Sequence, residues 1–153
     1  MGLYIEVILI WGIHFSQQQL KNLTHIFQQF SETETFAKYS TQMDKDAEDP
    51  DNLGDMLILT DGEMGHLFEV FLNQQITLIP ELKFHYYLGS EGPVITLGHT
   101  VKVLCDTKAG FNTVTVGDID TPNQPLGRAL AAVGEQLNIK LPEGKLFVVT
   151  EAE

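Results

Sequence analysis

The sequence predicts a single α+β domain in which a mixed, mostly antiparallel sheet packs against three amphipathic helices. The spacing of apolar residues along the chain gives the element order β-α-β-α-β-β-β-α-β, which favours one sheet with helices packed on it. The length of 153 residues is close to the commonest size of one domain. Apolar residues make up 43% of the chain and charged residues 20%, which is typical of a globular protein.

The first strand is predicted over residues 3–13, because both alternating sets of side chains are apolar there apart from Glu6. A strand that is apolar on both faces is usually central in a sheet that is covered on both sides. The run has no Lys or Arg before it and is too short to cross a bilayer. We therefore expect neither a signal peptide nor a membrane-spanning segment in it.

Three segments have the spacing of amphipathic helices, with apolar residues three and four positions apart. They begin at Ser16, Thr60 and Thr121, and each of these residues is followed three positions later by Gln or Glu, which is a capping box. The second helix is expected to end near Gln75 and the third at Asn138. The apolar stripes are Leu20, Leu23, Ile26, Phe27 and Phe30 in the first helix, Met64, Leu67, Phe68, Phe71 and Leu72 in the second, and Leu126, Ala129, Leu130, Val133 and Leu137 in the third.

Five further segments are short and apolar enough to be strands. Turn residues at Gly89–Gly92 and Lys108–Gly110 separate three of them, so antiparallel hairpins are expected there. Pro80 is expected to interrupt the segment that contains it. The predicted strands are residues 56–59, 76–88, 93–105, 111–119 and 146–150.

A polar, irregular segment at about residues 31–55 is predicted to be a long exposed loop, and loops of this length in compact domains are often functional or disordered. The chain has a net charge of −12, and its acids are concentrated in the second half of this loop. Six of them are predicted to bind a partner: Asp44, Asp46, Glu48, Asp49, Asp51 and Asp55.

The composition argues against several classes of function. Arg128 is the only arginine and no cluster of bases is present, so direct binding to nucleic acid or to an anionic membrane is not expected. The acidic loop begins like a calcium loop at Asp44, but it has Asp49 where an EF-hand needs glycine and Asp55 where it needs glutamate. No nucleotide-binding or zinc motif is present, and the sequence therefore indicates no cofactor and no metal site.

The remaining chemical groups have simpler explanations than catalysis. Cys105 shares a predicted strand with Val101 and Val103, and this spacing favours a core cysteine. His66 has Glu63 three residues before it and Glu69 three residues after it, so these three are expected to be neighbours on a helix surface.

A small metal-dependent hydrolase is the alternative that the sequence leaves open. It would use Asp118 and Asp120, which precede a helix start, together with His14. The preferred hypothesis is instead an acidic inhibitor that neutralises a basic protein, such as a nuclease or another nucleic-acid-handling protein. Immunity proteins and phage anti-defence proteins offer an analogy of charge and size. A third interpretation is a structural subunit of a virion or complex, and the single cysteine fits a cytoplasmic location.

Overall fold

The computed structural model describes residues 5–15, 17–40, 63–89, 92–106, 110–111 and 123–152. In chain order, the described elements are β1 (Ile5–Phe15), α1 (Gln17–Leu20), the 3₁₀ turn η1 (Lys21–Leu23), α2 (Thr24–Ser31), α3 (Glu34–Ser40), α5 (Glu63–Gln75), β2 (Lys83–Gly89), β3 (Gly92–Asp106), β4 (Gly110–Phe111), α7 (Asn123–Leu137) and β5 (Lys145–Ala152). No helix among these segments is long and apolar enough to cross a membrane.

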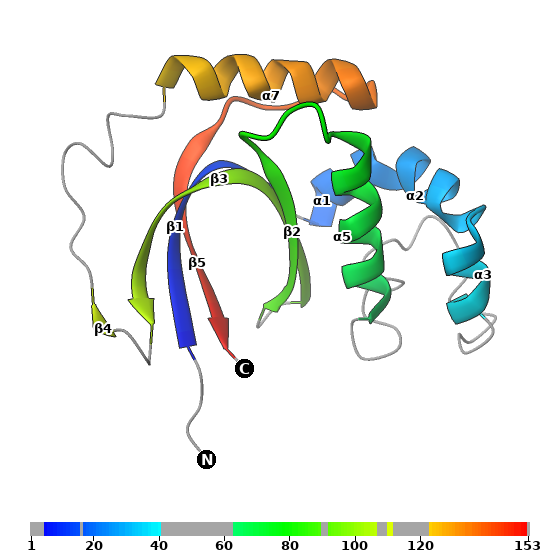
Figure 1. Cartoon of the computed structure of the whole chain (residues 1–153), viewed down its shortest axis with the longest axis horizontal. Coiled ribbons are helices and arrows are strands. Elements are labelled where there is room, and N and C mark those ends of the chain that lie inside the picture. The colour runs from blue at the N-terminus through cyan, green and yellow to red at the C-terminus, as the bar shows by residue number, and fades with distance from the viewer. Residues whose placement is uncertain are drawn as a thin grey trace.

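The strands form one sheet in the order β2-β3-β1-β5, and the short strand β4 pairs with β3 (Figure 1). Every strand pair in the described part of the chain is antiparallel. In this order, β3 lies between β1 and β2, and β1 lies between β3 and β5, while helices occur in the connections from β1 to β2 and from β3 to β5. The predicted α+β class is confirmed, and so is the central position of β1.

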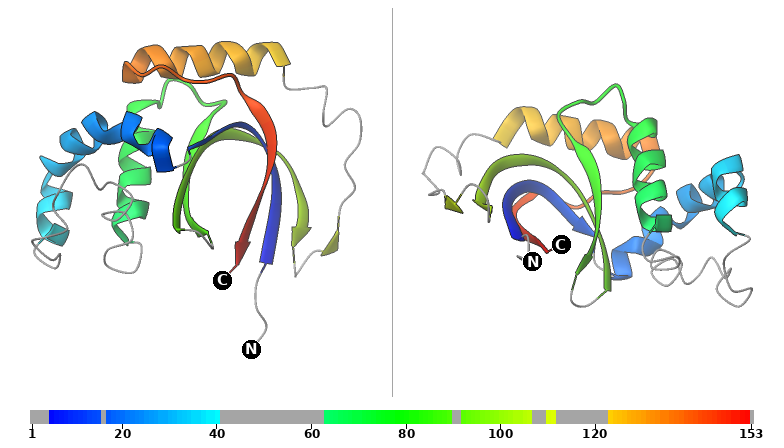
Figure 2. Two further views of the ribbon diagram at one scale, coloured as in Figure 1. Left: turned by 180° about the vertical axis from the view of Figure 1, so that it is seen from behind. Right: turned by 60° about the horizontal axis from the view of Figure 1, so that its bottom comes forward.

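The sheet is strongly curled. Gly12 of β1 faces Gly98 of β3. A Cβ atom on Gly12 would lie 2.1 Å from a backbone oxygen of β3, and one on Gly98 would lie 2.5 Å from Cγ2 of Ile10, so neither position accepts a side chain. The β1–β3 ladder is also irregular on both sides of Ile8 and Leu9, and such bulges bend a strand. The sheet consequently forms an arch in which β2 and β5 approach within 8 Å between Cα atoms without pairing (Figure 2).

The helices cover the outer side of the arch. Trp11, Ile13 and Phe15 alternate along β1 and face the helices, and all three are buried. The predicted stripes are confirmed as core: every stripe residue is buried except Leu67 and Phe71, which pack partly buried against the same cluster. The inner side of the arch is also apolar near its middle, where Ile10 and Val149 are buried. These positions explain why β1 is apolar on both faces.

The helical region differs from the prediction in two places. The first helix is not continuous, because the 3₁₀ turn η1 separates α1 from α2. Residues 34–40, predicted as loop, form helix α3 instead. Its start is stabilised by Thr33, whose hydroxyl accepts a hydrogen bond from the backbone N–H of Phe36 at 3.3 Å, and the Phe36 ring packs against the core.

The boundaries of two other elements also depend on local chemistry. The strand predicted at 76–88 begins only at Lys83, because Ile76 closes a turn by accepting a hydrogen bond from the N–H of Ile79 at 2.9 Å. Helix α7 ends before Asn138 as expected: this residue has a φ of 53°, and the next N–H donates to the carbonyl of Gly134. The predicted strand at 56–59 and residues 112–119 lie outside the described residues.

Candidate functional site

Five phenylalanines fix the helices on both sides of the predicted acidic segment. The ring centroids of Phe27 and Phe68 are 5.1 Å apart, and those of Phe30 and Phe71 are 5.4 Å apart, so α2 is packed on α5. Phe36 places α3 in the same group, with centroids 5.8 Å from Phe27 and 5.6 Å from Phe30. Edge and tilted contacts of this kind each add about 0.5–1.5 kcal/mol beyond burial. Helices α3 and α5 therefore belong to the same packed layer. The segment between residues 41 and 62 connects the end of α3 to the start of α5 in the sequence.

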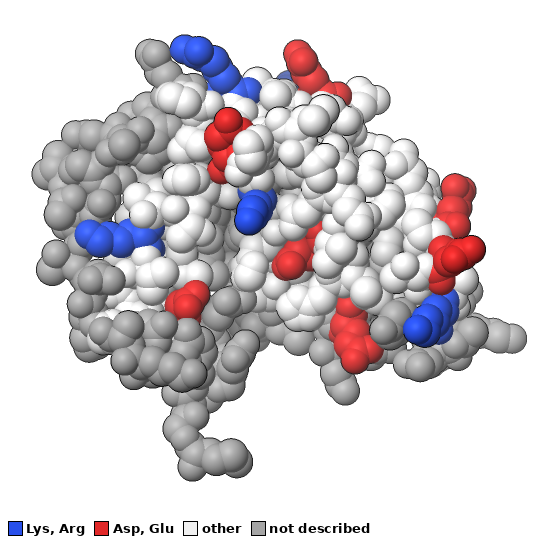
Figure 3. All heavy atoms as spheres, in the orientation of Figure 1, with Lys and Arg blue, Asp and Glu red and all other residues white. Residues whose placement is uncertain are grey.

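Exposed acidic side chains lie at the start of each of the two helices that flank this segment in the sequence. Glu32 and Glu34, at the start of α3, and Glu63, at the start of α5, are exposed, and Lys38 is the exposed base among them. Figure 3 shows carboxylates on the side of the molecule where α3 lies. Between residues 41 and 62 the sequence carries seven acids and one base, which is half of the net charge of −12. The six predicted binding acids fall in that stretch and lie outside the described residues.

The residues of the hydrolase hypothesis are described only in part. His14 lies near the end of β1 and is exposed, and its ring contacts that of Phe147 edge-on with centroids 6.1 Å apart. Asp118 and Asp120 fall outside the described residues, so their distance from His14 is not tested. Within the described segments, no group of three or more His, Cys, Asp or Glu side chains is arranged to hold a metal ion.

Cys105 is half-buried and is not a core residue, so that expectation was wrong. The reason lies in β3. The β1–β3 ladder skips one residue between Val103 and Cys105 and another between Thr100 and Lys102. Simple alternation of faces does not survive such bulges, and the spacing from which a core position was inferred does not apply across them.

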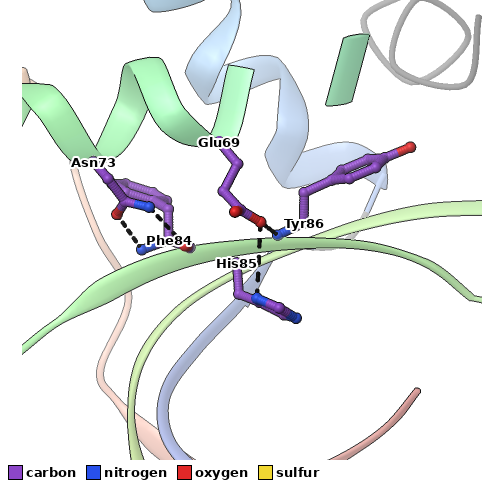
Figure 4. A network of polar contacts seen from close by, with 5 residues as sticks. All are labelled: Glu69, Asn73, Phe84, His85 and Tyr86. Carbon is purple, nitrogen blue, oxygen red and sulfur yellow. Dashed lines mark hydrogen bonds and ion pairs between the residues drawn. The ribbon is translucent and has the colours of Figure 1, made fainter. Parts of the chain in front are cut away.

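The α5–β2 contact is a seam of hydrogen bonds between helix side chains and a strand edge (Figure 4). Asn73 accepts from the backbone N–H of Phe84 at 2.7 Å and donates from Nδ2 to the carbonyl oxygen of the same residue at 3.0 Å. One turn earlier, the Glu69 carboxylate accepts from the backbone N–H of Tyr86. Its Oε2 also lies 3.7 Å from Nδ1 of His85. The two helix side chains thus take the place of a further strand along β2.

This seam corrects the prediction that Glu63, His66 and Glu69 are surface neighbours. Glu63 and His66 are exposed, but Glu69 is half-buried and turned toward the strand. The His66 ring lies edge-on to Tyr86, with centroids 5.1 Å apart. Tyr86 is 1% exposed, and this burial raises the pKa of its phenol to about 12.

Among the described residues, hollows open beside the sheet in at least two places. One, of about 280 Å³, lies on the inner side of the arch next to the seam and carries His85, Lys83 and the buried Thr96 among its lining residues. The other, of about 910 Å³, lies between the end of α7 and the segment leading to β5, over Trp11. Ligand pockets usually have about 300–1,000 Å³ and a few converging polar groups. The hollow of about 280 Å³ is small for this range. In the hollow of about 910 Å³, the charged side chains, such as Lys140, are exposed. Neither hollow therefore identifies a substrate.

The sequence did not reveal Glu69 and Asn73. The sequence nevertheless contains a signal for these two residues. They are four positions apart, and each directly follows a buried stripe residue of α5. This spacing places both side chains on one side of the helix, at the border of its apolar face. Of the residues predicted for a binding or catalytic site, His14 is the one that falls within the described residues. Comparisons of the chain with protein-family models, with curated proteins and with solved structures find no match.

Proposed function

We propose that the protein binds and neutralises a basic protein partner through its acidic segment, and that it does so in the cytoplasm. The observation that carries this proposal is the concentration of charge: half of the net charge of −12 lies between residues 41 and 62. The exposed Glu63 directly follows that segment, and the exposed Glu32 and Glu34 lie one helix before it, at the start of α3. Their attachment to the phenylalanine-packed layer supports the proposal, since a fixed base lowers the entropy lost on binding.

The charge pattern also favours a class of partner. A cluster of carboxylates attracts a protein that carries many Lys and Arg side chains, such as a nuclease or another protein that handles nucleic acid. Electrostatic complementarity of this kind raises the rate of association and excludes acidic competitors. Competition with nucleic acid for the same basic surface would inhibit such a partner.

Two variants with the same loss of charge test whether the position of the acids matters. In the first, D46N/E48Q/D49N, three acids of the segment are neutralised. In the second, E81Q/E135Q/E143Q, three exposed acids on other parts of the surface are neutralised. Each tagged full-length protein is used to capture partners from its native cells, at low salt and at about 0.5 M salt, where charges are screened within a few ångströms.

We expect one basic protein to be captured in stoichiometric amount by the wild-type protein and by the second variant at low salt. The first variant and the high-salt wash should lose it. Capture of no basic protein, or equal loss with both variants, would contradict the proposal. A partner retained by both variants would likewise place the binding surface elsewhere.

A further inference from the structure

The two edges of the sheet are treated differently by the fold. On β2, the outward backbone groups of Phe84 and the N–H of Tyr86 are bonded to side chains of α5. A strand edge covered in this way cannot add another strand, and natural proteins commonly protect sheet edges by such covers. The fold therefore closes one of its two edges internally.

The edge formed by β5 has no hydrogen-bonded cover in the described part of the chain, although β2 comes within 8 Å of β5 between Cα atoms. β5 stands at the end of the strand order, and the described segments contribute no hydrogen bond to its outer side. It pairs with β1 through eight consecutive residues, Lys145–Ala152, without a bulge, and it contains no proline or glycine. Near its middle, Val148 is 54% exposed. A regular, uncovered strand with an exposed valine at its centre is suited to pairing with another strand.

We propose that β5 pairs with β5 of a second copy of this chain, antiparallel, about a two-fold axis that passes beside Val148. This register places Val148 opposite itself and Lys145 opposite Glu151 of the other copy, so opposite charges meet at both ends of the ladder. Between them, Phe147 faces Val149. A shift of two residues toward the start of the strand would instead set Lys145 opposite Val149, and both charge pairs would be lost.

The pairing would join two sheets into one, in the order β2-β3-β1-β5-β5-β1-β3-β2. The two β2 strands stand at the ends of this order, and side chains of α5 cover Phe84 and Tyr86 of each. The same strand of each copy makes the contact about a two-fold axis, so this contact joins two copies and does not extend into a fibre. Self-packing of this kind is what the structural-subunit interpretation of the sequence requires.

Cysteine cross-linking tests the register directly, because residues opposite each other in an antiparallel pair have Cβ atoms about 4.5–5.5 Å apart, near the separation that a disulfide bridges. Val148→Cys is made in a C105S background, which removes the native thiol. Val70→Cys in the same background is the matched control, since Val70 is 53% exposed on α5, compared with 54% for Val148. Under mild oxidation, V148C should form a covalent dimer, whereas V70C should remain largely without a covalent cross-link.

Native mass spectrometry and sedimentation of the unmodified protein provide the second measurement. We expect a species of twice the 17.1 kDa of one chain. Lys145→Glu should weaken it about tenfold, since like charges would then meet at both ends, and the double variant K145E/E151K should restore it. Restoration excludes simple unfolding as the cause. A wild-type protein that is monomeric at every concentration, cross-linking of V148C no faster than that of V70C, or a double variant as weak as K145E would overturn the proposal.

Discussion

Replacing Asn73 by alanine should be among the more damaging substitutions on the partly exposed surface of α5. The amide makes two hydrogen bonds to the backbone of Phe84, at 2.7 and 3.0 Å. Each is worth about 1 kcal/mol net, and the loss leaves a strand N–H and carbonyl without their partner. Alanine is the better helix former by roughly 0.5 kcal/mol, which offsets part of the loss. The expected net decrease in the free energy of unfolding is about 1.5–2.5 kcal/mol.

Urea unfolding, followed by circular dichroism, measures this difference. With a slope of about 2 kcal/mol per molar urea, the midpoint should fall by about 1 M. Gln74→Ala is the control, because Gln74 is the exposed neighbour on the same helix and its loss should change stability by less than about 0.5 kcal/mol. If N73A unfolds within that margin of the wild type, the hydrogen bonds of Asn73 do not stabilise the fold.

Three further predictions concern α5, α7 and β2. Gly65→Ala should lower stability by about 1–3 kcal/mol, because its Cβ would lie 2.1 Å from the Tyr86 ring. Gly127→Ala should instead raise stability by about 0.5–1 kcal/mol in the same urea assay, because no atom lies within 4 Å of the new Cβ. Equal effects of the two substitutions on stability would show that Gly65 does not pack against Tyr86 as described. Asn138→Ala should lower the thermal midpoint because φ is 53° there, whereas Asn138→Gly should not; a loss of equal size in both would argue against backbone strain. Burial raises the pKa of the Tyr86 phenol from 10.0 to about 12 in the folded protein, so its contribution to stability is full below pH 10 and is lost as the pH rises toward 12. Phenolate absorbance should show one late-titrating tyrosine that Tyr86→Phe removes, and an unchanged titration in that variant would contradict the assignment.

The fold class and the core followed from the sequence because both depend on local periodicity. The stripe residues of the three predicted helices, from Leu20 to Leu137, are all buried or pack against the core. Asn138 ended its helix as expected, since its backbone conformation is one that asparagine tolerates. Helix α3 was missed because it has few apolar residues and depends on Phe36 contacting rings of α2, a contact that spacing within α3 does not reveal.

The parts of the surface that were missed depend on pairing between distant segments. Glu69 and Asn73 become important only because the edge of β2 lies beside α5, and nothing within the helix indicates which strand will be there. The expectation for Cys105 failed because two bulges in β3 changed the register with β1. The charge of the acidic segment, in contrast, is a property of composition and needed no fold to be recognised.

The rate at which the captured partner associates, measured with the two variants of equal charge, tests the proposed function most directly. If the acidic segment steers the encounter, D46N/E48Q/D49N should associate at least about tenfold more slowly than E81Q/E135Q/E143Q at low salt. The difference should shrink as salt rises to about 0.5 M. Equal association rates for the two variants at low salt would contradict the account, because attraction would then depend on total charge and not on the segment between residues 41 and 62.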